Sequence, residues 1–311
     1  MEMRVSNFDE LIQQVKQKNV KEGGKKKVAV MCADDEEVLA AVVEARDSGV
    51  ADSFLVGNKA KILKVAEESK LDISSMEIID ESDVAKIGEI CTTLVNSGKA
   101  SVMMKGLVSS SDYMRAILNK EKGLRSGKQL SHVAVFDLPT YHKLLAVTDA
   151  AVTIRPNIEE KIGLISNAAD IMRKLGVKKP KVAAICAVET VNPEKMPATV
   201  DAQKLSEMAK AGTLGDVFVD GPFALDVAVS KHAAKVKKLD NMDVPGDADV
   251  ILADDIESGN MIYKCLCNFG QGRSAAIVAG AKAPLVLTSR SDTHESKYLS
   301  IVLAIATSNN Q

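Results

Sequence analysis

Three polar clusters in the sequence combine residue types that suit the binding of an anion, and each follows an apolar run. The first cluster consists of Lys105, Gly106, Ser109, Ser110 and Ser111. Glycine lets a ligand approach the backbone closely, and serine hydroxyls donate hydrogen bonds to it. A helix that begins at this point would also offer its first N–H groups to an anion. The same residues are typical of a solvated, serine-rich helix start, and composition alone leaves both interpretations open.

The second cluster, residues 288–292, places an arginine among hydroxyl residues. The guanidinium of Arg290 is always charged, and Ser289 and Ser291 flank it, so the segment suits a phosphate group or a developing oxyanion. A surface ion pair between Arg290 and Asp292 is the alternative interpretation. The residue types therefore indicate a possible anion site without excluding an ordinary surface segment.

The third cluster begins with Asp254 and Asp255 and ends with Asn260. The cluster again follows a predicted strand. Tyr263 and Lys264 follow about one helical turn later. Taken alone, the cluster is equally typical of a capped helix start.

Several more specific motifs are incomplete, which narrows the chemistry. Residues 270–275 form only a fragment of a dinucleotide-binding fingerprint, and residues 123–129 fall one residue short of a P-loop and lack its final Ser or Thr. Cys265 and Cys267 have no second pair of ligands, and the four histidines form no HExxH motif. We therefore expect no structural metal and no nucleotide hydrolysis.

The elements that must position these clusters are indicated by an alternation of short β-branched runs with longer charged segments of helical period. This alternation predicts an α/β fold in which a parallel or mixed sheet is flanked by helices. Ligands of such sheets bind beyond the carboxyl ends of the strands, where all three clusters are expected. The predicted strands cover residues 27–33, 52–57, 76–80, 99–105, 131–136, 144–149, 181–187, 217–220, 250–254 and 283–290.

Length and composition indicate an ordinary globular protein. The chain has 311 residues, 46% of them hydrophobic and 26% charged. This length favours two domains, and a change in the sequence pattern predicts a boundary near residue 128. A net charge of −2 and an aromatic content of 3% argue against nucleic-acid binding. Five cysteines in mostly apolar runs, no signal sequence and no apolar stretch of roughly 20 residues predict a cytoplasmic protein with no membrane partner.

Seven segments, in order and with compatible spacing, together resemble the phosphate acetyl/butyryltransferase family. They cover residues 104–115, 130–136, 141–145, 148–151, 219–222, 256–264 and 287–292. The similarity extends from about residue 27 to the C-terminus and is strongest with the butyryl-transferring branch. No one of these segments would carry the resemblance by itself.

The resemblance implies a bilobed, isocitrate-dehydrogenase-like fold with the active site in the cleft between the lobes. One lobe would comprise residues 1–128 plus 286–311, and the other residues 129–285. The implied reaction is the reversible conversion of a short-chain acyl-CoA and inorganic phosphate into an acyl phosphate and CoA. CoA would be a substrate, with no metal or redox cofactor, and the protein would be a homodimer whose product is used by an acyl phosphate kinase.

The resemblance also implies roles for the residues that match the family's pattern. Arg290 would hold the phosphate and stabilise the developing charge, assisted by the hydroxyl of Ser289. The hydroxyls expected to complete this anion site are those of Ser109, Ser110 and Ser111. Further contacts to phosphate or CoA are implied for Lys105, Arg115 and Asn260. For Arg115, an arginine on a helix surface is the alternative interpretation.

The general base departs from the family pattern. The acetyl-specific branch has an aspartate about two helical turns after the last strand, where this chain has Ser296. We expect Asp292 to act instead, because a carboxylate two residues after the arginine can reach the same site while its charge is compensated. His294 and Glu295 are nearby alternatives, and Lys297 is a further candidate that would lower the pKa of the CoA thiol directly.

Three alternatives to a butyryl-specific enzyme remain open. Acetyl or propionyl transfer is compatible with the same residues, because acyl preference depends on pocket volume. A decarboxylating dehydrogenase of related fold would need a metal-binding aspartate cluster, which Asp254 and Asp255 resemble. A protein that binds CoA or acyl phosphate for regulation would keep the site without the base.

The assignment of Arg290 is tested by the Arg290→Ala substitution. Loss of the guanidinium is expected to lower kcat for phosphate-dependent acyl transfer by about 100-fold or more, because charge stabilisation in the transition state is lost. The rate is measured as release of free CoA thiol. Near-wild-type activity of a folded variant would contradict the assignment.

Overall fold

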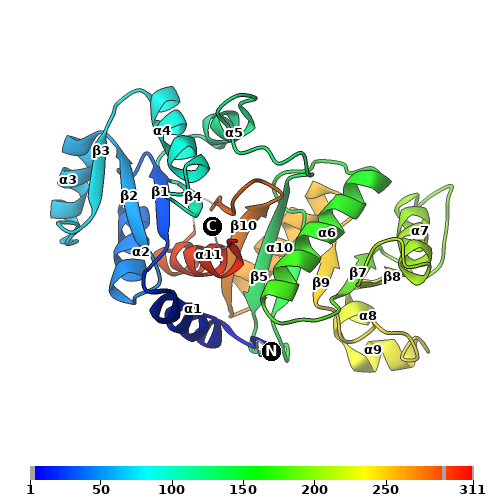
Figure 1. Cartoon of the computed structure of the whole chain (residues 1–311). Coiled ribbons are helices and arrows are strands. Elements are labelled where there is room, and N and C mark those ends of the chain that lie inside the picture. Colours follow the sequence, from blue (N-terminus) through cyan, green and yellow to red (C-terminus); the bar gives the residue numbers. More distant parts are fainter. Residues whose placement is uncertain (1–3, 289–291, 310–311) are drawn as a thin grey trace. The chain divides into compact units, whose positions relative to one another are not determined.

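The computed structural model describes residues 4–288 and 292–309, which form two compact units (Figure 1). The first unit comprises Phe8–Lys128 and Ala275–Gln311, and the second comprises Met1–Asn7 and Gln129–Ser274. The chain therefore enters the second unit at Gln129 and returns to the first at Ala275, whereas the sequence-based division places that return at residue 286. The predicted α/β class with a mixed sheet and flanking helices is confirmed.

In the first unit, five strands run parallel and a sixth is antiparallel to its neighbour. Their order is β3 (Glu77–Asp80), β2 (Asp52–Gly57), β1 (Lys27–Met31), β4 (Val102–Lys105), β11 (Leu285–Val286) and the antiparallel β10 (Arg273–Ala279). The helices are α1 (Phe8–Glu22), α2 (Glu36–Asp47), α3 (Lys59–Glu68), α4 (Val84–Asn96), α5 (Ser110–Leu118) and α11 (His294–Thr307). Within the predicted last strand, residues 283–290, Leu285 and Val286 pair with β4, and Ser289 and Arg290 lie outside the described residues.

Helices α4 and α5 pack together on one side of this sheet, while α11 packs with α1 and α2 on the other (Figure 1). Helix α11 is buried almost all round, from Lys297 to Ile305, which explains why it carries no polar stripe. Its first turn is capped by the hydroxyl of Thr293, which accepts from the backbone N–H of Ser296 at 3.3 Å. The apolar C-terminal segment is thus part of the core of the first unit.

The register of β4 brings three strand ends to one edge of the first unit. Met31 of β1 lies opposite Lys105 of β4, and Met104 lies opposite Val286 of β11. Because all three strands run parallel, the segments that follow them leave the sheet at the same edge. Two of the three polar clusters predicted from the sequence begin there.

The second unit contains five further strands of mixed direction. Its strands are ordered β5 (Ser131–Asp137), β6 (Leu145–Thr148), β9 (Val250–Leu252), β7 (Lys181–Ile185) and β8 (Phe218–Phe223). Strands β5 and β6 pair antiparallel, and the remaining pairs are parallel. The helices are α6 (Ile158–Lys174), α7 (Ala198–Lys210), α8 (Leu225–Val229), α9 (Lys231–Val236) and α10 (Ile256–Phe269). No helix in the described part of the chain is long and apolar enough to cross a bilayer.

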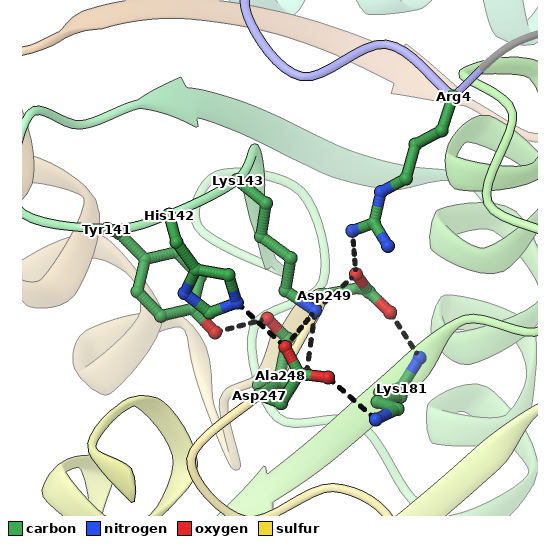
Figure 2. Close-up of polar contacts among 8 residues, drawn as sticks. All are labelled: Arg4, Tyr141, His142, Lys143, Lys181, Asp247, Ala248 and Asp249. Carbon is green, nitrogen blue, oxygen red and sulfur yellow. Dashed lines mark hydrogen bonds and ion pairs between the residues drawn. The ribbon is translucent and has the colours of Figure 1, made fainter.

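A cluster of ion pairs lies at the amino ends of β6, β7 and β9 (Figure 2). The Asp249 side chain, 2% exposed, accepts from Arg4 at 2.8 Å and from the ammonium of Lys143 at 2.7 Å. Its neighbour Asp247 accepts from Lys143 at 2.9 Å and from Lys181 at 2.6 Å. Buried lysines and aspartates are stable only when paired, so this cluster fixes the amino edge of the sheet and holds the N-terminal segment on the second unit.

This cluster predicts an acid-sensitive contribution to stability. Burial raises the pKa of Asp247, but hydrogen bonds from Lys181, Lys143 and His142 outweigh burial and hold the pKa well below its ordinary value. A depressed folded pKa contributes stability above the ordinary aspartate pKa, and this contribution disappears as the pH falls below about 4. Asp247→Asn is therefore expected to lower the free energy of unfolding by about 1–2 kcal/mol at pH 7 and by less at pH 3.

The measurement is urea denaturation of the wild type and the variant at both pH values. Asp216→Asn serves as the control, because Asp216 is 74% exposed and lies 3.9 Å from Lys179. That substitution should leave the midpoint unchanged at both pH values. An equal loss of stability for Asp247→Asn at pH 7 and pH 3 would contradict the electrostatic explanation.

Candidate active site

The first cluster forms the start of helix α5 in the first unit. The Ser109 hydroxyl accepts from the backbone N–H of Asp112 at 3.0 Å and donates to the Asp112 carboxylate at 2.7 Å. The Ser111 hydroxyl lies 2.8 Å from the Ser109 hydroxyl. The helix-cap interpretation of Ser109 is therefore confirmed. Ser110, the first residue of the helix, is exposed, so the hydroxyl-rich helix start is accessible.

Arg115 lies on the last turn of α5 and forms an ion pair with Asp112 of the same helix. A hydrogen bond from Ser109, together with this ion pair, lowers the pKa of Asp112. The Arg115 side chain is 76% exposed, and an exposed pair of this kind contributes little to stability. The guanidinium is thus free to exchange its partner for another anion at small cost.

Lys105 ends β4 and is only 6% exposed, which its sequence position alone does not reveal. Its ammonium donates to the carbonyl of Gly106 at 3.3 Å. Cys32, at the end of neighbouring β1, is also buried, and its pKa is raised to about 11 by burial and by Asp34 and Asp112 despite Lys105. The Cys32 thiol is consequently protonated at neutral pH, as is typical of a buried cysteine.

The second cluster leads into helix α11, and Ser289, Arg290 and Ser291 lie outside the described residues. Lys297 is 4% exposed, and its ammonium donates to the backbone carbonyl of Asp292. Lys297 therefore fixes the chain at Asp292, which is partly exposed. This interaction joins the two residues predicted to act on the thiol proton.

The alternative bases are positioned differently. His294 lies 3.7 Å from the carboxylate of Glu44 on α2, while Glu295 is exposed in the first turn of α11. Burial raises the pKa of Glu44, and His294 opposes this effect. Ser296 donates its backbone N–H to the hydroxyl of Thr293, which caps the helix. These contacts give His294 and Ser296 local structural roles.

The third cluster starts helix α10 of the second unit with a capping box. The Asp255 carboxylate accepts from the backbone N–H of Ser258 at 2.9 Å, and the Ser258 hydroxyl accepts from the backbone N–H of Asp255 at 3.4 Å. Asn260 donates its side-chain amide to the carbonyl of Ala150 at 3.0 Å. The capped-helix interpretation is confirmed, and Asn260 also anchors the segment that follows β6.

Lys161 on α6 is a buried cation that the sequence pattern did not single out. It is 4% exposed and forms ion pairs with Asp254 and with Asp201, the latter at 2.9 Å. Burial lowers the pKa of Lys161, but hydrogen bonds to both aspartates outweigh it and raise the pKa, so the lysine is charged. A single lysine inside a helical pattern gives no sequence signal of such a role.

Asp254 and Asp255, the carboxylates on which the dehydrogenase alternative depends, both have partners in the structure. Asp254 is paired with Lys161, and Asp255 caps α10. Across residues 4–288 and 292–309, no group of three or more His, Cys, Asp or Glu side chains is arranged to hold a metal ion. Both aspartates therefore have structural partners within the second unit.

Together, the described contacts define an α/β protein whose first unit brings the buried Lys105, the hydroxyls of residues 109–111 and the start of α5 to the carboxyl end of β4. Asn260 belongs to the second unit and is not part of this group. Free N–H groups at helix starts and nearby cations favour a negatively charged ligand. The site is thus suited to a phosphate-bearing substrate.

Comparison with known proteins agrees with this class. The family model described as phosphate acetyl/butaryl transferase matches residues 8–93 and 82–305. The chain is 43% identical over 307 residues to phosphate butyryltransferase of Clostridium acetobutylicum, covering 99% of this chain and 100% of that protein. It is 44% identical over 298 residues to phosphate butyryltransferase of Clostridium beijerinckii, covering 96% of each.

A solved structure shares the same fold. The branched-chain phosphotransacylase from Enterococcus faecalis superimposes with a TM-score of 0.80 at 30% identity, covering 91% of this chain and 98% of that one. The family match, the relatives and this structure all extend over most of the chain. The chain belongs to the phosphate acetyl/butyryl transferase family.

Proposed function

We propose that this protein is a phosphate butyryltransferase, which converts butyryl-CoA and inorganic phosphate into butyryl phosphate and CoA, reversibly. The observation that supports this most strongly is the identity of 43–44% to phosphate butyryltransferases along nearly the whole chain. The collection of anion-binding features at one edge of the first unit is consistent with a phosphate-bearing substrate. Acyl transfer needs no change of oxidation state, so we propose CoA as substrate and no metal or redox cofactor.

The proposed chemistry assigns a role to each part of the site. With butyryl phosphate as donor, the CoA thiol loses its proton, attacks the carbonyl and forms a tetrahedral oxyanion, from which phosphate leaves. Arg290 and Ser289 hold the phosphate and stabilise the oxyanion, and Asp292 accepts the thiol proton. The hydroxyls and N–H groups at the start of α5 bind the phosphate oxygens.

Lys297 supports the role proposed for Asp292 by fixing its backbone. Its buried ammonium donates to the Asp292 carbonyl, so the position of the carboxylate is constrained before substrate binds. A positioned base needs less reorganisation in the transition state. We therefore assign Asp292 as the base and Lys297 as its positioning residue, in place of the aspartate that Ser296 replaces.

We further propose that the protein is a cytoplasmic homodimer whose product feeds an acyl phosphate kinase. An acyl phosphate is a reactive mixed anhydride, so a kinase that transfers its phosphoryl group conserves this energy. Helix α10 supports the dimer, because it exposes apolar side chains four residues apart on one face. They belong to Met261, which is 67% exposed, to Cys265, and to Phe269, which is 80% exposed.

The proposed activity predicts release of free thiol from butyryl-CoA only when inorganic phosphate is present. Purified protein is incubated with butyryl-CoA or acetyl-CoA, with and without phosphate, and the thiol is detected with a chromogenic disulfide. We expect phosphate-dependent release that is faster with butyryl-CoA and that persists in EDTA. Faster release from acetyl-CoA would identify an acetyltransferase instead. A folded protein that binds CoA without releasing thiol would favour the regulatory alternative.

The proposed dimer predicts that a charge on the apolar face of α10 separates the subunits. Phe269→Asp is expected to convert the dimer to a monomer, because a carboxylate cannot be buried unpaired in an apolar interface. Sedimentation velocity at matched concentration measures the change. Val20→Asp on α1 is the control, because Val20 is 82% exposed on another element. A monomeric wild type, or dimers for both variants, would contradict the proposal.

A further inference from the structure

Leu107 is an apolar side chain placed between the polar groups of the first cluster. It follows the buried Lys105 and Gly106 at the end of β4, precedes the capping Ser109 by two residues, and is 52% exposed. Isolated exposed leucines are common on protein surfaces, so exposure alone assigns no role. Two further observations distinguish this leucine: its backbone is held in place, and its neighbours are the groups that suit an anion.

The backbone at Leu107 is fixed against β1. The N–H of Gly106 donates to the carbonyl of Met31 at 2.9 Å, and the N–H of Leu107 donates to the carbonyl of Cys32 at 2.7 Å. A Cβ at Gly106 would lie 2.1 Å from the Cys32 carbonyl oxygen, so only glycine permits this approach. The chain cannot shift at this point without breaking both hydrogen bonds.

Val108, the residue after Leu107, is buried in the core. Val108 is 6% exposed, and its N–H donates to the carbonyl of Gly106 at 2.9 Å. With Val108 in the core and the preceding backbone fixed, the side chain of Leu107 is kept at the surface. A half-exposed leucine held in this way is pre-organised to contact an apolar group without a conformational cost.

The substrates of the proposed reaction carry a short hydrocarbon chain one carbonyl away from a phosphate or a thioester. The start of α5 suits the anionic end, and Leu107 is the large apolar side chain beside it. We propose that Leu107 forms one wall of the acyl-chain pocket and favours butyryl over acetyl groups. The reason is that a butyryl chain covers more of the exposed leucine surface than a single methyl group does. This inference rests on the proposed function.

The experiment compares kcat/KM for butyryl-CoA and acetyl-CoA, each with saturating phosphate, in the wild type and in Leu107→Ala. The butyryl-to-acetyl ratio is expected to fall about fivefold to tenfold, mainly through the loss with butyryl-CoA. Leu107→Val should lie between the two. Leu118→Ala is the matched control, because Leu118 is a leucine of similar exposure, 45%, at the far end of α5. Its ratio should equal that of the wild type.

The outcomes separate the pocket proposal from the proposed function. An unchanged ratio in both Leu107 variants overturns the acyl-pocket role. An equal loss with both acyl-CoAs also overturns it, because the leucine would then contact the part of CoA that the two substrates share. If the wild type releases no thiol from any short acyl-CoA, the proposed function itself fails. Leu107→Val removes little volume and keeps the comparison possible if Leu107→Ala is poorly folded.

Discussion

The close approach of β4 to β1 at Gly106 is the constraint on which the candidate site depends. A side chain at this position would collide with the Cys32 carbonyl, and glycine allows the hydrogen bonds that continue the sheet beyond Met31. The same strand pairs with β11 on its other side. One register therefore places the buried Lys105, the outward Leu107 and the start of α5 beside the strand that leads to α11. A shift of this register would separate them.

Buried lysines hold the loops of both units by a common physical principle. Lys297 is held by the Asp292 carbonyl, Lys161 by two aspartates, and Lys143 by Asp247 and Asp249. A buried ammonium without acceptors would cost several kcal/mol, so each lysine restricts the segments that supply its acceptors. In the second unit these interactions order both edges of the sheet, which leaves Asp254 committed to Lys161 and Asp255 committed to a helix cap.

Much of the fold was predictable because strands and helices impose different periods on apolar residues. The β-branched runs predicted the strands. The prediction was less accurate for the last strand, because among the described residues 283–288 only Leu285 and Val286 pair with β4. Composition determines that a segment prefers burial, while strand length depends on how much of it has a partner.

The sequence by itself determined the α/β class, the clusters of residues suited to anions and, through resemblance, the family. The tertiary structure decided which of these residues meet. The structure brought the ends of β4 and β11 to one edge and showed that Ser109 and Asp255 cap helices. It also revealed Lys161 and Lys297 as buried cations, although nothing distinguishes them in the sequence from lysines at the surface. The physical reason is that burial and pairing depend on contacts between segments distant in the chain, while local pattern reports only the preference of each segment.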